Sequence, residues 1–323
     1  MQRRVALLWS CNVSHGGNRH ASNACFAGRA GRLARARLQL FQVKQQLRSA
    51  NRELNQLRGQ GHEASPAQNW VVVFELGSGK DEVIVSLQQL TPGELQRKVA
   101  AREAETARIY LLPGFAPKGL AEAVLGAAES KQGAYGFRPS RVRSAEEAPR
   151  TVGVIDTHAR RAEQCSLWGE VDGAVVQELE RRFCAVSGGE VQRLEKLEVA
   201  RTLPGGFFEQ HHDGSERDVS QLLWLRACRQ GGETSFPAFG LRFAPSQRSL
   251  LMWRNSRQGD GIDSSPDERL VHEGCEVISG EKVIVSAWLQ RDIVRPARQS
   301  HRERLRQRRR ARSCADATES NPE

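Results

Sequence analysis

An α+β fold is predicted by this sequence, with a closed or sandwiched antiparallel sheet braced by helices. Helical patterns dominate the segment before residue 190, whereas short strand-like runs separated by Gly and Pro follow it. Runs of short strands with turn residues between them are typical of antiparallel sandwiches and barrels. Hydrophobic residues make up 39% of the 323 residues, which suffices for one sizeable core with appendages or for two small domains.

The chain begins with a basic segment. Residues 1–52 contain ten Lys and Arg residues and no acid, so the net charge of +10 arises largely at the ends. Such a composition is typical of an organellar transit peptide, a weak secretory signal or a disordered basic tail. Apolar spacings of three and four predict a helix at 38–59, either a lone surface helix or a short coiled coil that pairs chains. We therefore expect residues 1–68 to be a targeting or disordered segment.

A different pattern begins at residue 69 and predicts alternating strands and helices. Two apolar runs on either side of "GSGKD" are typical of a β-hairpin, and a threonine precedes the first helical pattern as a cap. A glycine closes the last helix of this region. The segments are "WVVVFEL" and "EVIVSL" for the hairpin, "TPGELQRKVAAREAE" for the capped helix, "ARIYLLPGF" for a strand, and "APKGLAEAVLGAAES" and "VDGAVVQELERRFCAVSG" for two further helices.

Short strands fill the region after residue 190. We predict a folded domain over 69–294 with its strand core at about 190–292, and a disordered arginine-rich tail over 295–323. No apolar run approaches the roughly 20 residues that span a bilayer. Seven cysteines without a C-x-x-C pair predict neither a disulfide framework nor a zinc knuckle. The predicted strands lie in "LEKLEVARTL", "VSQLLWLRA", "GLRFAPS", "RSLLMWRN", "EVIS" and "EKVIVSAWLQ".

Titratable residues gather in "FFEQHHDG", residues 207–214. On a strand, residues two apart point to the same face, so His211 and Asp213 can reach one ion together while His212 points away. A third ligand is available in His272, at the edge of another predicted strand in "LVHEGCEV". Two imidazoles and one carboxylate form the facial triad of non-haem iron(II) oxygenases, whereas structural zinc would usually need four protein ligands.

A lysine follows His272 by ten residues, in "GEKVIVSAWL". On this strand Lys282, Ser286 and Trp288 share one face. An ammonium group on a strand that is apolar on both faces is costly to bury unless an anion meets it. A dicarboxylate co-substrate would supply that anion, with one end on the iron and the other on Lys282.

Together, "VARTLPGGFFEQHHD", "GGETSFP", "RSLLMWRN" and "LVHEGCEVISGEKVIVSAWL" resemble the catalytic domain of prolyl 4-hydroxylases, of the 2-oxoglutarate and iron(II)-dependent dioxygenase superfamily. The resemblance covers roughly residues 107–292. It implies a double-stranded β-helix (jelly roll) core and the use of iron(II), 2-oxoglutarate, O₂ and L-ascorbate. It also implies that His211, Asp213 and His272 bind iron, that Lys282 and Thr234 contact 2-oxoglutarate, and that Trp288 forms a pocket wall.

Three positions depart from the usual pattern of these hydroxylases. Thr202 and Phe208 stand where many relatives have tyrosine, and Ser286 stands where asparagine is common. These changes leave the predicted iron ligands and Lys282 untouched. They bear on the contacts with the co-substrate and on substrate preference.

The resemblance implies hydroxylation of a proline-containing protein or peptide, with release of succinate and CO₂. Two alternatives remain: an oxygenase of the same superfamily acting on nucleic acid or another substrate, and a non-catalytic basic binding protein on the same scaffold. Nucleic-acid oxygenases of this superfamily usually anchor 2-oxoglutarate with arginine, so Lys282 favours the prolyl branch and no specific nucleic-acid partner is expected. The resemblance favours the endoplasmic reticulum, with the mitochondrion or plastid as alternatives.

Overall fold

The computed structural model describes residues 69–77, 83–101, 106–142, 154–257 and 265–295. The predicted helix at 38–59, the hairpin turn at 78–82 and residues 296–323 of the basic tail lie outside this part of the chain. Within it, no helix is both long enough and apolar enough to cross a membrane.

The described strands form one large antiparallel sheet in the order β2-β1-β3-β12-β8-β15-β6-β5-β4. The predicted hairpin is confirmed, because β1 pairs antiparallel with β2 along its length. β3 pairs with both β1 and β12, which carries this early hairpin into the same sheet as the late strands. The bounds are β1 Asn69–Gly77, β2 Val83–Leu90, β3 Thr106–Leu112, β4 Arg138–Pro139, β5 Glu163–Leu167, β6 Leu197–Thr202, β8 Arg217–Arg226, β12 Leu250–Arg254 and β15 Lys282–Gln290.

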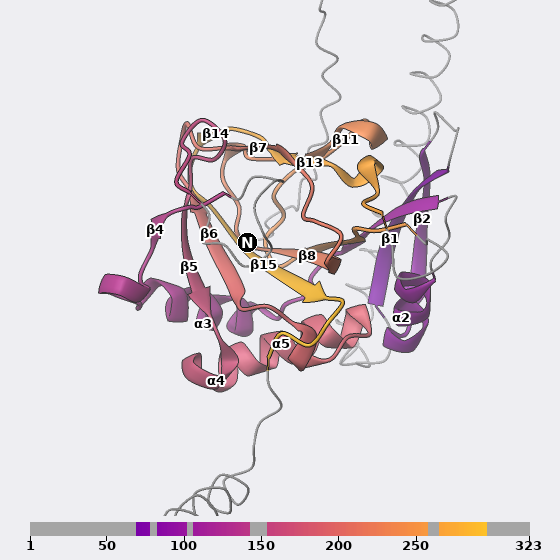
Figure 1. The fold of residues 1–323 in the computed structure, drawn as a ribbon, viewed down its shortest axis with the longest axis horizontal. Helices are drawn as coiled ribbons and strands as arrows, with labels where there is room; N and C mark the ends of the chain where they lie inside the picture. The colour runs from indigo at the N-terminus through magenta and orange to yellow at the C-terminus, as the bar shows by residue number, and fades with distance from the viewer. Residues whose placement is uncertain (1–68, 78–82, 102–105, 143–153, 258–264, 296–323) are drawn as a thin grey trace, which may run out of the picture.

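A smaller sheet of short strands, in the order β11-β10-β13-β7, carries the histidines of the candidate site. A two-stranded ribbon of β14 and β9 lies beside it. Figure 1 shows β7, β13 and β14 on the side of the large sheet that is away from the helices. The bounds are β7 Phe208–His211, β9 Gln230–Gly231, β10 Thr234–Phe236, β11 Leu241–Phe243, β13 His272–Gly274 and β14 Val277–Ser279.

Helices form within the predicted segments 91–105 and 116–130, but the helix predicted over 171–188 is interrupted at Gly173, whose φ is 88°. α2 (Pro92–Ala100) begins with a capping box, in which the Thr91 hydroxyl accepts from the Glu94 amide and the Glu94 carboxylate accepts from the Thr91 amide. α3 spans Lys118–Glu129, α4 spans Gly169–Asp172, and α5 (Ala174–Ser187) ends at Gly188, whose left-handed φ of 75° suits glycine. In Figure 1 these helices line one side of the large sheet.

Two hydrophobic clusters hold the layers together. The first joins α2, α3 and α5 to the large sheet and includes Val283, Val285 and Ala287 of β15. The second fills the space beside the smaller sheet with aromatic side chains, among them the fully buried Trp224 and Phe236. The side chains of β15 that alternate with the first cluster face this second region, where the candidate site lies.

Candidate metal centre

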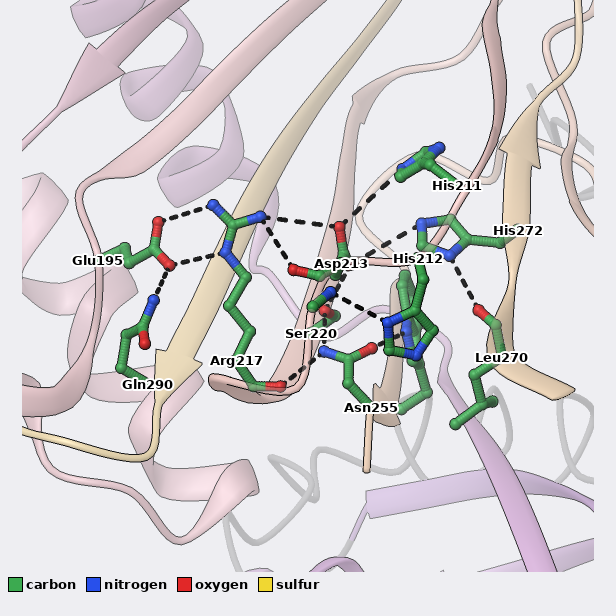
Figure 2. Close-up of polar contacts among 12 residues, drawn as sticks. Glu195, His211, His212, Asp213, Arg217, Ser220, Asn255, Leu270, His272 and Gln290 are labelled. Atoms are coloured by element: carbon green, nitrogen blue, oxygen red, sulfur yellow. Dashed lines mark hydrogen bonds and ion pairs between the residues drawn. The ribbon is translucent and has the colours of Figure 1, made fainter. Parts of the chain in front are cut away.

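Three potential ligands meet at the end of β7. His211 is the last residue of this strand, and its register partner is His272, the first residue of β13. Asp213 lies two residues past the strand rather than on it, contrary to the sequence prediction that the strand continues through this position. Nevertheless, ligand atoms of all three residues lie within 4.8 Å of one another. Figure 2 shows dashed lines from the Asp213 carboxylate to both His211 and His272.

Hydrogen bonds to the backbone fix the tautomers of both histidines. Nδ1 of His211 lies 2.7 Å from the carbonyl oxygen of Glu209, and Nδ1 of His272 lies 3.0 Å from that of Leu270. A carbonyl can only accept, so Nδ1 carries the proton in each ring. The Nε2 lone pairs are therefore free to bind a metal. They lie 3.9 Å and 3.8 Å from the two carboxylate oxygens of Asp213, His211 to Oδ1 and His272 to Oδ2.

Burial sets the protonation states that ligation requires. It lowers the pKa of His211 to about 3, with the neighbouring His272 acting in the same direction. Burial likewise lowers the pKa of His272, so both rings are neutral at neutral pH. Burial alone would raise the pKa of Asp213, but electrostatic interactions with His272, His211 and the Arg217 guanidinium, together with the hydrogen bond from Ser220, hold it below its usual range. The cluster thus offers two neutral imidazoles and one carboxylate, which suits a divalent transition metal.

A directed chain of hydrogen bonds orients Asp213. The indole of Trp253 can only donate, and it donates to the side-chain oxygen of Asn255 at 2.9 Å. The amide nitrogen of Asn255 donates to the hydroxyl of Ser220 at 2.8 Å, and that hydroxyl donates to Oδ2 of Asp213 at 2.5 Å. Because Trp253 can only donate, the donor and the acceptor of each following hydrogen bond in this series are fixed in turn. The sequence analysis did not identify Ser220 or Asn255, since their roles depend on pairing between β8 and β12.

A partly buried ion pair supports the loop that carries Asp213. Arg217 makes two hydrogen bonds to the carboxylate of Glu195, of 2.7 and 3.0 Å, and donates to the backbone oxygen of Asp213 at 3.4 Å. Its guanidinium also lies 3.9 Å from the centre of the Trp288 ring. Figure 2 shows Gln290 on the other side of the same glutamate. Bidentate pairing holds the loop against β15.

His212 does not join the cluster, in line with its predicted orientation. Its Nδ1 accepts a hydrogen bond from the amide of Gly214 at 3.0 Å, which leaves Nε2 as the protonated nitrogen. That Nε2 is buried and has no hydrogen-bond partner in the described structure. His212 therefore shapes the turn after β7 and does not face the candidate metal position.

One pocket contains all nine residues that the sequence analysis selected. Its walls come from β6, β7, β8, β10, β12, β13 and β15, together with the segment before β5. Arg160, Ser220 and Trp253 also line it, and the sequence analysis did not select them. The selected residues in this pocket are Thr202, Phe208, His211, Asp213, Thr234, His272, Lys282, Ser286 and Trp288.

Lys282 is buried in the same pocket and has no carboxylate partner among the described residues. It is 5% exposed, and its Nζ donates to the carbonyl oxygen of Gly232 at 3.0 Å. Burial lowers its pKa, while Cys228 and Cys275 act in the opposite direction. An ammonium group can donate three hydrogen bonds, so this lysine has capacity for an incoming anion.

Residues 197–290 match the family model of the 2OG-Fe(II) oxygenase superfamily. Prolyl 4-hydroxylase 1 of Arabidopsis thaliana is 29% identical over an alignment of 139 residues, and the match covers 36% of this chain and 47% of that protein. Prolyl 4-hydroxylase subunit alpha-2 of Gallus gallus is 29% identical over an alignment of 164 residues, and the match covers 47% of this chain and 30% of that protein. The chain thus spans half or less of the length of these two relatives.

Solved structures were compared in the same way. A viral collagen prolyl hydroxylase from Paramecium Bursaria Chlorella virus-1, in complex with 2OG, is 22% identical with a TM-score of 0.42 and covers 56% of this chain and 95% of that one. A Pseudomonas putida prolyl-4-hydroxylase is 18% identical with a TM-score of 0.44 and covers 62% of this chain and 99% of that one.

Proposed function

We propose, from the prolyl 4-hydroxylase-like 2OG-Fe(II) oxygenase domain that this chain contains, that the protein hydroxylates peptidyl proline. The observation that carries the proposal is the convergence of three ligand atoms within 4.8 Å in a pocket that also contains a buried lysine. The first feature suits iron(II), and the second suits the far end of a dicarboxylate. Packing of the domain alone explains neither the ligand cluster nor the buried lysine as well as these two ligands do.

His211, Asp213 and His272 would hold the iron. Their donor set fits, because both Nε2 lone pairs are available and the carboxylate is ionised. Three protein ligands leave open positions on one side of the metal for co-substrate and O₂. When bound, iron would couple the oxidative decarboxylation of 2-oxoglutarate, to succinate and CO₂, to hydroxylation of a C–H bond with O₂ as the oxidant. The prolyl 4-hydroxylase resemblance adds L-ascorbate as the reductant that keeps the iron ferrous.

Lys282 would bind the carboxylate of 2-oxoglutarate that lies away from the iron. Its burial makes the charge pair strong, since little water competes for either partner. Thr234 lies in the same pocket, where its hydroxyl is available to the same co-substrate. Trp288 and Phe208 supply apolar walls that exclude water from the reacting group. Thr202 and Ser286 complete the lining on β6 and β15.

We assign a double-stranded β-helix to the core, braced by helices that precede it. Supporting this assignment, the large sheet and the β11-β10-β13-β7 sheet both contribute walls to the pocket. Buried residues of α2, α3 and α5 share one cluster with the large sheet. Ligands on short strands at the pocket end, supported by a rigid sheet, would keep the site preorganised.

Turnover with a proline-rich peptide tests the function. Wild-type protein with iron(II), 2-oxoglutarate, O₂ and ascorbate should release succinate and form hydroxyproline in equal amounts, both measured by mass spectrometry. His211→Ala should abolish both products, because it removes one ligand. Succinate without hydroxyproline would indicate an oxygenase with another substrate. Full activity of the His211→Ala protein would contradict the assignment of the iron site.

A further inference from the structure

A second cation lines the pocket beside Lys282. The backbone of Arg160 bridges to Phe208, and the flanking Ala159 and Arg161 bond to Glu209 and Phe207. This pairing holds the Arg160 side chain over β7. The guanidinium carbon lies 4.5 Å from the centre of the Phe208 ring, and that ring stacks on His211 with 3.7 Å between ring centres. The guanidinium is therefore one aromatic ring away from a proposed iron ligand.

Arg160 has no acidic partner among the described residues, in contrast to Arg217 and Arg295. Arg217 pairs with Glu195, and Arg295 pairs with Glu180. By contrast, Nε of Arg160 is buried and makes no hydrogen bond. Burial lowers the pKa of Arg160 to about 10, and the charges of Glu198 and Asp213 oppose this effect without an ion pair. The guanidinium presents N–H donors in a planar fork, and no acceptor for them is found among the described residues.

Arg160 and Lys282 also repel each other across the pocket. The charge of Arg160 is among the causes that lower the pKa of Lys282. Both side chains line the same pocket, and neither forms an ion pair within the described residues. Two unpaired cations in one partly buried pocket are unfavourable unless a ligand brings negative charge to both. Phe208, between Arg160 and the metal position, has no hydroxyl that could serve as a donor instead.

We propose that Arg160 is a second carboxylate-binding residue of this pocket, acting alongside Lys282. Its fork can bind a carboxylate through two hydrogen bonds, which a lysine cannot do. Two sources of that carboxylate fit the geometry: the far end of 2-oxoglutarate, or an acidic side chain next to the target residue of the protein substrate. The inference rests on the proposed oxygenase function, and it identifies the chemistry of a ligand contact at the same pocket.

Binding measurements on Arg160→Gln and Arg160→Lys proteins test the proposal. The first arm measures the affinity of 2-oxoglutarate for Mn(II)-loaded protein by anaerobic calorimetry, without turnover. The second arm uses two proline peptides that differ only in having Glu or Gln beside the proline. It measures how tightly each peptide binds to Mn(II)-loaded protein in the presence of 2-oxoglutarate. Arg161→Gln is the matched control, because Arg161 is the next residue and does not line the pocket, although its guanidinium lies 5.7 Å from the ring centre of Phe207, which does. Mn(II) affinity and thermal unfolding establish that each variant is folded and loaded.

A contact with the co-substrate predicts that Arg160→Gln weakens 2-oxoglutarate binding by about tenfold to a hundredfold, as the loss of a charged hydrogen bond does, with Arg160→Lys intermediate. If Arg160 contacts the substrate, Arg160→Gln should leave the affinity for 2-oxoglutarate unchanged. The wild-type protein should bind the Glu peptide more tightly than the Gln peptide, and Arg160→Gln should remove this difference. Either result supports the proposal.

The proposal is overturned if Arg160→Gln and Arg161→Gln behave alike in both arms. In that case Arg160 serves only to pack on Phe208 or to balance Glu198. Failure of the wild-type protein to bind 2-oxoglutarate at all would instead contradict the oxygenase function itself. The two failures are therefore distinguishable, because one concerns the variant and the other the parent protein.

Discussion

At the scale of single residues, hydrogen bonds determine which polar groups near the proposed metal position donate and which accept. Trp253 can only donate, so it determines how Asn255 is oriented, and through Ser220 this reaches Asp213. Backbone carbonyls likewise fix the protonated nitrogen of His211. Such supporting contacts hold ligands in place before a metal binds, which reduces the cost of ordering them.

Ser220→Ala should weaken metal binding by about 10- to 100-fold, the usual effect of removing a partner that orients a ligand. Ser220→Thr retains the hydroxyl and should bind metal nearly as well as wild type. Calorimetry with Co(II), and the visible spectrum of the bound Co(II), would measure affinity and ligand geometry separately. Equal affinities and spectra for the alanine variant and wild type would show that this hydroxyl does not position Asp213.

The buried side-chain amide of Gln221 should lower the stability of the fold. Both polar atoms of its amide are buried without a hydrogen-bond partner in the described structure, and the residue is 1% exposed. An unpaired buried polar group costs about 1–3 kcal/mol, so Gln221→Met should raise the free energy of unfolding by a similar amount. Urea denaturation would measure it. Gln290→Met should do the opposite, because that amide bonds Glu195. A loss of stability in Gln221→Met would imply that the amide has a partner.

At the scale of elements, the sequence predicts the long segments and some short strands, such as β11 and β14, but misses others. The alternation along β15 places Lys282, Ser286 and Trp288 on one face, and all three line the pocket. By contrast β9 and β10 have only two and three residues, too few for a periodic signal. They are strands because partners distant in the chain pair with them. The same reason hid Arg160, whose surroundings in "THARRAEQC" have the composition of a charged loop.

The turn between β9 and β10 tests how an element positions Lys282. Gly232 has φ 69°, and a Cβ there would lie 3.3 Å from Cδ of Lys282 and 2.7 Å from the sulfur of Cys228. Gly240 has a similar φ of 60° but nothing within 4 Å of its added Cβ. Alanine at either position should cost about 1–2 kcal/mol of stability from backbone strain.

Only Gly232→Ala should also weaken 2-oxoglutarate binding, because the new methyl group displaces the lysine stem. Calorimetry on Mn(II)-loaded proteins would compare the two variants at matched occupancy. Equal 2-oxoglutarate affinity in the two alanine variants would mean that this turn does not determine the position of Lys282.

On the scale of the whole molecule, the hairpin, the helices and the late strands are combined into one unit by long-range pairing. β3 and β12 are about 140 residues apart by number yet adjacent in the sheet. Residue type and spacing led to the predictions for His211, Asp213, His272 and Lys282, because chemistry restricts which residue types can bind a metal or a carboxylate. The other predicted pocket residues followed from the resemblance to prolyl 4-hydroxylases. The order of strands could not be predicted from local pattern, since it depends on contacts between distant segments. We also propose that the folded domain includes Arg295, one residue past the boundary predicted at 294.

Arg295 lies at this boundary of the folded domain. Arg295 is buried and pairs with the buried Glu180 at 2.8 Å, and it also donates to the carbonyl oxygen of Glu195. Arg295→Met should lower the free energy of unfolding by about 3–5 kcal/mol, because it leaves a buried carboxylate unpaired. The double variant with Glu180→Leu should recover part of that loss. Chemical denaturation measures all three proteins. A single variant as stable as wild type would place Arg295 outside the folded domain.

Titration with a metal is the most direct test of the proposed iron site of His211, Asp213 and His272. Anaerobic calorimetry with Fe(II), supported by Mn(II) electron paramagnetic resonance, should find one metal per wild-type chain. His211→Ala, Asp213→Ala and His272→Ala should each abolish saturable binding while leaving the fold intact by circular dichroism. A variant lacking any one of the three side chains that still binds one metal with wild-type affinity would contradict the account.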